Sequence, residues 1–304
     1  MNVVCLSGGV GGARLACGLY DVLAADELTV VGNVGDDLEV LGLAVSPDLD
    51  SILYALAGLN DTERGWGRAG ETWNALASAT AWGGESWFQL GDLDIGLHLV
   101  RTRALRAGSA LSAVTADIVV RAGLRLSLLP ATDSPLRTHV VTTAGRFSFQ
   151  EWFVGRRHAD PVDAVEFEGA ADTLPAPGVL EALRGAELII VAPSNPYVSV
   201  GPILAVPGLR EAIAARHSPC VAVSPLIGGE AVKGPAAGML QRLAGGTTPA
   251  HVAGCYEGLI DRLVIDHADA ASRSPALPLT ITGTLMTDRG AARRLAETIL
   301  QEAS

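Results

Sequence analysis

The residues best suited to chemistry lie in the first fifty positions, beginning with a glycine-rich turn. A short apolar run at 3–6 has the length of a strand and leads into Ser7-Gly-Gly-Val-Gly-Gly-Ala13. From 14 to 25, leucine and valine recur at helical spacing. Glycines at a strand-to-helix turn let backbone N–H groups approach a phosphate, with the positive end of the helix behind them. We therefore expect an anion to bind at Gly8, Gly9, Gly11 and Gly12.

A pair of carboxylates follows the next predicted strand. Residues 28–31 form a second apolar run, which ends in Asn33-Val-Gly-Asp36-Asp37. Ligands of an open α/β sheet bind outside the carboxyl ends of its strands, so this segment shares an edge with the glycine turn. Magnesium prefers oxygen ligands and commonly uses one or two carboxylates together with substrate phosphates. Asp36 and Asp37 are therefore predicted to be catalytic and to hold Mg²⁺, with Asn33 at the substrate.

Both segments also have simpler interpretations. Glycine turns join strands to helices in many α/β proteins, and paired acids are common in solvated turns. The turn is not a dinucleotide fingerprint, because Arg14 stands where a third glycine is required and no acid follows roughly 20 residues on. It also lacks the Gly-Lys-Ser/Thr of a Walker A loop. The conjunction of anion turn and carboxylate pair at one edge favours the binding of a phosphorylated ligand.

Further candidates are spread along the chain. Acidic pairs recur at Asp48/Asp50 and Asp92/Asp94, each at the start of a predicted helix, where capping is the alternative role. Trp66 stands between two glycines, so it can stack on a flat ring more readily than it can pack in a core. The remaining candidates for substrate binding are polar residues in or beside predicted loops: Thr72 and Asn74 around Trp73, Ser194 and Asn195 between two prolines, and Lys233 after a glycine pair.

Composition narrows the class of protein. The formal charge of −11 and the absence of a basic stripe argue against a nucleic-acid partner. We find no apolar run of about 18 residues and no export signal, so we expect no membrane partner and a cytoplasmic location. The four cysteines lack CxxC spacing and read as reduced thiols. The six histidines show no metal-binding spacing, and no G-x-S-x-G elbow is present.

The order of elements predicts the fold. Apolar runs at 125–129, 188–192, 220–224, 263–266 and 280–282 alternate with helical patterns, which is typical of a Rossmann-like, doubly wound, mainly parallel α/β sheet. Residues 136–153 read as a hairpin with strands at 138–142 and 147–154. Helices are expected at 49–59, 71–82, 92–107 and 111–122, which makes about 60–125 a helical insertion. We find no linker that would divide residues 1–304 into separate domains.

Taken together, these segments resemble the 2-phospho-L-lactate transferase family. The resemblance rests on GGVGGARL, NVGDD, SPDLDSILYALAG, RGWG with ETWNA, LGDLDIGLHLVRTRAL, LLPATD, FQEWFV, APSNPYVSVGPILAVPGLR, SPLIGG with AVKGPA, and LMTD, in order from Gly8 to Asp288. The similarity is greatest to actinobacterial members. Any one segment alone is weak, whereas the ordered set is specific.

The resemblance implies a step in the biosynthesis of coenzyme F420. Family members transfer a phospholactyl or phosphoenolpyruvyl group from a guanosine-diphosphate-activated donor to the terminal ribityl hydroxyl of the deazaflavin Fo, and GMP leaves. The implied protein is a Mg²⁺-dependent homodimer whose partners are small-molecule substrates. The implied metal and Fo residue is Asp36; Gly8 to Gly12 lie at the donor phosphates, and Ser194 to Pro196 line the nucleotide side.

Two questions stay open at the level of sequence. Gluconeogenesis-factor proteins resemble the same superfamily, so a nucleotide-sugar-binding regulator without transferase chemistry is an alternative function; RGWG, ETWNA and FQEWFV favour the transferase. Lactyl and enolpyruvyl donors differ by one double bond, and the actinobacterial likeness favours enolpyruvyl. An NAD-linked dehydrogenase is disfavoured by the missing third glycine and the missing acid.

Overall fold

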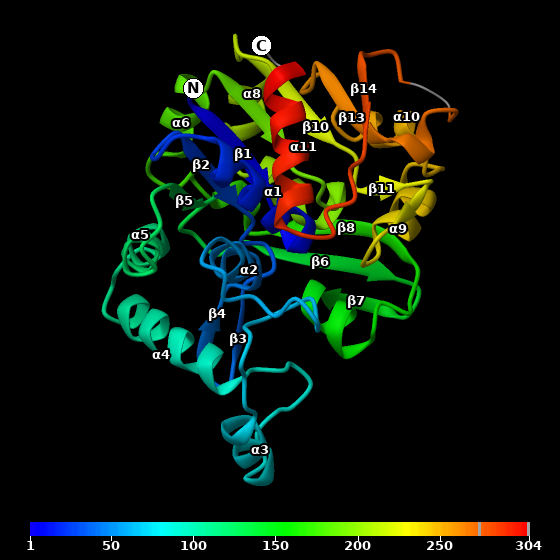
Figure 1. Cartoon of the computed structure of the whole chain (residues 1–304). Coiled ribbons are helices and arrows are strands. Elements are labelled where there is room, and N and C mark those ends of the chain that lie inside the picture. The colour runs from blue at the N-terminus through cyan, green and yellow to red at the C-terminus, as the bar shows by residue number, and fades with distance from the viewer. Residues whose placement is uncertain (273–274, 303–304) are drawn as a thin grey trace.

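A parallel seven-stranded sheet forms the centre of the protein, seen in a computed structural model that describes residues 1–272 and 275–302 (Figure 1). The strands lie in the order β14-β13-β10-β9-β1-β2-β5, and every neighbouring pair is parallel. Their bounds are β1 (Val3–Ser7), β2 (Leu28–Gly32), β5 (Ser127–Pro130), β9 (Leu188–Val191), β10 (Cys220–Val223), β13 (Arg262–Asp266) and β14 (Leu279–Thr282). The residues of β1, β9 and β10 are all buried, as expected for parallel strands covered on both faces.

The direction of winding reverses between β1 and β9. From β1 the chain proceeds to β2 and β5 on one side, whereas β9 leads to β10, β13 and β14 on the other. Leu6 of β1 is in register with both Val31 of β2 and Val191 of β9, so the carboxyl ends of these three strands lie together. A crevice forms outside the strand ends at such a switch point, and it is the usual ligand site of doubly wound sheets.

Helices cover both faces of this sheet. One apolar cluster joins it to α1 (Gly9–Val22), α2 (Pro47–Leu56), α5 (Leu111–Arg121) and α11 (Arg289–Glu302). A second cluster on the opposite face joins it to α6 (Val179–Gly185), α7 (Gly201–Ala205), α8 (Leu209–Ala214), α9 (Ala236–Leu243) and α10 (Pro249–Gly254). Figure 1 shows α11 alongside α1 in front of the sheet and α6 and α8 behind it. The Rossmann-like, doubly wound α/β fold predicted from the sequence is confirmed.

Smaller units lie at the carboxyl edge of the sheet. A hairpin of β3 (Leu38–Val40) and β4 (Leu43–Val45) precedes α3 (Asn74–Ala81) and α4 (Asp92–Arg106), and Figure 1 shows α3 at the end of the molecule farthest from the sheet. A separate antiparallel sheet has the order β7-β6-β8, with β6 (Arg137–Thr142), β7 (Gly145–Ser148) and β8 (Val162–Glu168). The short pair β11 (Leu226–Ile227) and β12 (Glu230–Ala231) follows β10.

Several predicted boundaries differ from the structure. The strand predicted at 147–154 is wrong beyond Ser148, because Glu151–Gly155 form a π-helical turn, η1. The indole of Trp152 is buried there and donates to Asp160 O at 3.0 Å, and Phe149 stacks on Phe153 with 5.3 Å between ring centroids. The helices predicted at 49–59 and 71–82 are shorter and span Pro47–Leu56 and Asn74–Ala81. None of the helices in the described residues is long and apolar enough to span a bilayer.

Candidate functional site

A cavity of about 560 Å³ opens at the switch point of the sheet. The glycine turn after β1, the segment after β9 and Ser224 after β10 form one side of it. Side chains of α2 and α4, the aromatic segment 149–154 and the loops at 65–67 and 232–236 complete the lining. The helical insertion and the small antiparallel sheet therefore enclose the carboxyl edge of the parallel sheet, and most predicted site residues meet there.

The glycine turn begins α1 and packs closely against its neighbours. Gly9 has a φ of +65°, which favours glycine, and a Cβ on Gly11 would lie 2.4 Å from Pro193 O. The N–H of Gly8 donates to Ser194 Oγ at 3.3 Å, and that of Gly9 donates to Asp48 Oδ1 at 2.8 Å. Because the first N–H groups of a helix have no intrahelical partner, those of Val10 and Gly11 remain to face an anion in the cavity.

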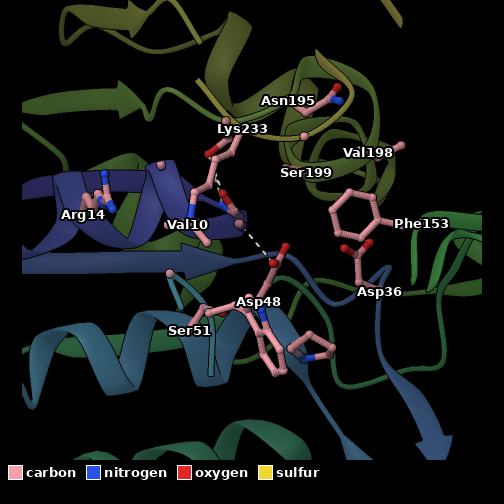
Figure 2. Close-up of a pocket in the computed structure, with 18 of the residues that line it drawn as sticks. Val10, Arg14, Asp36, Asp48, Ser51, Phe153, Asn195, Val198, Ser199 and Lys233 are labelled. Atoms are coloured by element: carbon pink, nitrogen blue, oxygen red, sulfur yellow. Dashed lines mark hydrogen bonds between the residues drawn. The ribbon is translucent and has the colours of Figure 1, made fainter. Parts of the chain in front are cut away.

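Four aspartates line the cavity: Asp50 is paired with Arg101 and Asp94 accepts from Tyr54, whereas Asp36 and Asp48 are the candidates to bind a cation. Both carboxyl groups are buried and both residues line it, as Figure 2 shows. Burial, followed by the nearby charge of Asp48, raises the pKa of Asp36 well above its usual value. Burial also raises the pKa of Asp48 to about 6, although hydrogen bonds from Asn33 and Gly9 oppose the shift. The side chain of Asn33 lies behind the cavity and donates from Nδ2 to Asp48 Oδ2 at 2.8 Å.

Asp37, predicted to share the metal with Asp36, does not line the cavity. Its Oδ2 accepts a hydrogen bond from Ser46 Oγ at 2.8 Å, and burial raises its pKa to about 7. Asp36 lies in a tight turn that is closed by a hydrogen bond from Asp37 N–H to Val34 O at 3.2 Å, and the side chain of Asp37 is engaged by Ser46 on the far side of this turn from the cavity lining. The partner of Asp36 as a candidate cation ligand is instead Asp48 at the start of α2, which the sequence also allowed to be a capping residue.

The carboxylates suit a divalent cation that is completed by substrate oxygens. Within the described residues, Asp36 Oδ1 is buried and has no hydrogen-bond partner. Burial raises the pKa values of Asp36 and Asp48, and a bound cation would favour the ionised form of both carboxyl groups. No group of three or more His, Cys, Asp or Glu side chains in the described part of the chain could hold a metal by itself. The donor set therefore fits Mg²⁺ bound through carboxylates and phosphate.

Two basic side chains line the same cavity. Lys233, the only lysine in the chain, lies against the loop of Trp66, since a Cβ on Gly65 would lie 2.0 Å from its Nζ. Arg14 was missed as a site residue, although its position in the first turns of the helix after the glycines was a signal. Its Nη1 donates to Met286 O at 2.7 Å. Figure 2 shows Arg14 on one side of the view and Asp36 on the other, with Asp48 between them.

A buried charged network supports the wall made by α2 and α4. Arg101 donates from Nη1 to Asp50 Oδ2 at 2.9 Å and makes a second contact through Nη2. His98 Nδ1 lies 3.2 Å from Arg101 Nη1, and burial lowers the pKa of this imidazole to about 4. The hydroxyl of Tyr54 donates to Asp94 Oδ1 at 2.6 Å, and burial raises the pKa of Asp94 to about 6.

The segment after β9 lines the cavity but is largely occupied by its own contacts. Ser194 Oγ donates to Gly8 O at 2.7 Å, which ties this segment to the glycine turn. Asn195 Oδ1 accepts from the N–H of Tyr197 at 2.9 Å and thereby caps the π-helical turn Pro196–Val200, η3. Both residues are therefore in the predicted place, and each holds a loop in position as well as facing the cavity.

Aromatic side chains provide the apolar part of the lining. Trp66 lies at the mouth with 45% of its surface exposed, and Phe88, Phe149 and Phe153 are less exposed. Thr72 and Asn74, predicted to bind substrate, are not among the lining residues. Thr72 Oγ1 donates to Asp92 Oδ2 at 2.5 Å, and the Asn74 N–H donates to the same oxygen at 3.3 Å, so both residues join the start of α3 to α4.

Comparison with known proteins finds relatives that share one name and match most of this chain. Three proteins named phosphoenolpyruvate transferase are 44% identical (Kitasatospora aureofaciens, 99% of this chain and 97% of the relative), 42% identical (Streptomyces coelicolor, 99% and 97%) and 43% identical (Thermobifida fusca, 89% and 88%). Crystal structures of a Bacillus halodurans protein, described in one case as a member of the UPF0052 family, match with TM-scores of 0.66 and 0.63 at 19% identity. They cover 98% of this chain and 99% and 98% of theirs, and they show the fold alone.

The family itself is shown by a match along most of the chain. Residues 3–278 match the family described as 2-phospho-L-lactate transferase CofD, and this span includes the glycine turn, Asp36, Asp48, Trp66 and Lys233. The resemblance seen in the sequence is therefore confirmed: the chain belongs to the CofD family of 2-phospho-L-lactate transferases.

Proposed function

We propose that this protein transfers a phosphoenolpyruvyl group, or a 2-phospho-L-lactyl group, from a GDP-activated donor to the ribityl hydroxyl of the deazaflavin Fo. GMP leaves, and the product is a precursor of coenzyme F420. The observation that supports this most directly is the meeting of a helix start, two buried carboxylates and an aromatic wall in one cavity of a CofD-family chain. The name shared by the actinobacterial relatives favours the enolpyruvyl donor.

The diphosphate of the donor is assigned to the start of α1. Backbone N–H groups of Val10 and Gly11 would hold its oxygens, and the helix dipole would favour their charge. Arg14 and Lys233 would add positive charge from two further elements. These groups are fixed by the fold before the substrate arrives, so they stabilise developing charge without reorganising during the reaction.

Asp36 and Asp48 would hold Mg²⁺ against the same diphosphate. When bound, the ion would neutralise charge on the non-bridging and leaving oxygens. The chain's own contribution is to keep both carboxylates buried in the lining of one cavity: Asn33 holds Asp48, and the segment after β2 places Asp36 at the sheet edge. Asp37 would then not contact the ion, and its role would be to hold the segment that carries Asp36 through its hydrogen bond with Ser46.

The reaction exchanges one P–O bond for another. The ribityl oxygen bonds to the phosphorus that carries the enolpyruvyl group, the hydroxyl loses its proton, and the P–O bond to GMP breaks. Trp66 and the phenylalanines would bind the planar deazaflavin and limit access of water, which is the competing nucleophile. The substrates are small molecules; we further propose that the protein works as a homodimer in the cytoplasm.

Mass spectrometry of the product tests this function. The purified protein would be incubated with Mg²⁺, Fo and either the enolpyruvyl or the lactyl form of the guanylated donor. We expect GMP and a product heavier than Fo by the enolpyruvyl phosphate, with slower turnover of the lactyl donor. Omission of Mg²⁺ should stop the reaction. Absence of product from both donors, with Fo recovered unchanged, would refute the proposal.

A further inference from the structure

The loop that carries Trp66 is closed by its own hydrogen bonds. Asp61 N donates to Gly67 O at 3.0 Å, and Gly65 N donates to Asp61 O at 2.9 Å. The carboxylate of Asp61 accepts from the N–H groups of Glu63 and Arg64 at 3.0 and 2.8 Å. The backbone of residues 61–68 is therefore defined without a regular helix or strand, and only the orientation of the exposed indole remains to be fixed.

Arg64 contacts this indole and the loop at the same time. Its guanidinium carbon lies 4.6 Å from the ring centroid of Trp66 and 5.0 Å from that of Trp73. Nη2 donates to Asp61 Oδ2 at 2.9 Å and to Arg68 O at 2.8 Å, and Nε donates to Trp66 O at 3.3 Å. A planar cation that is hydrogen-bonded at its edge and faces two aromatic rings is rigid, because movement would break several contacts together.

The contacts with Arg64 hold Trp66 in the lining of the cavity. Its indole lines the cavity yet is 45% exposed, so packing alone confines it weakly. The two indole centroids are 6.2 Å apart and the planes are tilted by 58°, which leaves Arg64 as the closer of the two ring partners. Trp73 itself precedes α3, whose start is bound by Asp92 of α4, so the loop is connected to the body of the protein.

We infer that Arg64 is a positioning residue for substrate binding, which sets the indole of Trp66 at the cavity mouth so that a planar, multi-ring acceptor can stack on it. The inference rests on the proposed function for the identity of that acceptor. Arg64 touches the loop and the two tryptophans rather than the reacting atoms. Its effect is therefore on acceptor binding, with the chemical step and the donor site unchanged.

Steady-state kinetics with Fo separate these effects. In Arg64→Gln, the KM for Fo should rise about fivefold, in line with the loss of about 1 kcal/mol from a cation–π contact. The kcat and the donor KM should stay within about twofold. Arg64→Lys should recover part of the affinity, because it restores the charge without the planar fork. Trp66→Ala should raise the same KM at least as much as Arg64→Gln does.

Arg156→Gln is the matched control. Arg156 also packs on an aromatic ring, 4.5 Å from the centroid of Phe147, and it pairs with Asp160, but neither Arg156 nor Phe147 lines the cavity. Its kinetics should match those of the wild type. An unchanged KM for Fo in Arg64→Gln, or an equal rise in the control, would overturn the inference while leaving the transferase function standing.

A measurement without substrate keeps the inference testable if the protein does not transfer to Fo. With 5-fluorotryptophan incorporated, the fluorine resonance of Trp66 is assigned by its loss in Trp66→Phe. In Arg64→Gln it should move toward the position of a solvent-exposed indole, and Arg64→Lys should give an intermediate shift. A Trp66 resonance that is unaffected by Arg64→Gln would refute the positioning role, whatever the reaction.

Discussion

The carboxyl group of Asp36 is buried in a position that favours its protonated form. Burial and the charge of Asp48 raise its pKa well above the usual value. Asparagine closely mimics a protonated aspartate, so Asp36→Asn should change the free energy of unfolding by no more than about 1 kcal/mol. Transfer from the donor to Fo should fall at least about 100-fold, because asparagine cannot supply a charged oxygen to a cation. Urea unfolding and turnover measure the two effects.

Asp92→Asn is a suitable comparison for Asp36. Asp92 is also an acid at the carboxyl edge of the fold, but it contacts Thr72, Asn74 and Ala75 at the start of α3 and does not line the cavity. Its replacement should leave kcat, measured at saturating Fo, close to that of the wild type, because Asp92 acts on the cavity only through the loop that precedes α3. Turnover near the wild-type rate in Asp36→Asn would contradict the assignment of Asp36 as a cation ligand.

His98 gives the protein a dependence on pH that can be isolated. Burial, with a smaller effect from the charge of Arg101, lowers its pKa from 6.5 to about 4, although the nearby charge of Asp50 opposes the shift; Tyr54 and Asp94 lie on the same wall. Between pH 4 and 6.5 the unfolded state therefore binds more protons at this residue, so its contribution to stability falls as the pH falls. The full loss is about 3 kcal/mol relative to a residue that does not titrate.

The contribution of His98 is measured as a difference from His98→Gln. Other buried acids titrate in the same range, so the free energy of unfolding should be followed for both proteins from pH 7 to pH 4.5 in urea. The wild type should lose stability relative to the variant as the pH decreases. A difference that is flat over this range would show that the imidazole is not held neutral by its surroundings.

At the scale of elements, the features that depend on a short stretch of sequence were predicted, whereas those that depend on contacts between distant segments were not. The apolar runs of β1, β2 and β9 and the glycine turn are visible in sequence because their burial depends on short segments. The π-helical turn at 151–155 was missed, since Trp152 is placed by a contact with Asp160 rather than by a periodic pattern. Which acid faces Asp36 was equally inaccessible, because it depends on how α2 packs against the glycine turn.

The packing of α1 against α11 provides a test at this scale. A Cβ on Gly18 of α1 would lie 2.2 Å from Ala292 O of α11, so the two helix backbones must separate to admit a methyl group. Gly18→Ala should therefore lower the free energy of unfolding by about 1–3 kcal/mol. In α9, Gly238 has no atom within 4 Å of the same position, and Gly238→Ala should raise it by about 0.5–1 kcal/mol.

Equilibrium unfolding in urea measures both glycine variants under the same conditions. The opposite signs are the important result, because both changes add one methyl group within a helix. Two variants that are equally stabilised would show that α1 and α11 are not in the close contact seen here. Gly18 lies toward the carboxyl end of α1, whereas the cavity lies at the start of this helix. The turnover that remains in folded Gly18→Ala therefore reports on how rigidly α1 holds the glycine turn.

At the scale of the whole molecule, two of the 22 basic side chains of a strongly acidic protein line the cavity where an anion is expected. The formal charge is −11, yet Arg14 and Lys233 both line the cavity between the sheet and the insertion. The overall charge opposes the approach of a nucleotide, so binding depends on local groups and on a divalent cation. A diphosphate that joins the elements around this cavity should therefore stabilise the whole fold.

Thermal unfolding with nucleotides distinguishes the transferase from a nucleotide-sugar-binding regulator. A ligand that binds only the folded protein at about 100 times its Kd adds about 2.7 kcal/mol, which is roughly 5 °C in Tm for a chain of this size. GDP with Mg²⁺ should produce such a shift, and a chelator should remove most of it, because the diphosphate would then face Asp36 and Asp48 without a cation. UDP-glucose at the same concentration should change Tm by less than about 1 °C. A larger shift with UDP-glucose than with GDP would favour the regulator, since the site would then have been selected for a sugar nucleotide instead of a guanylated donor.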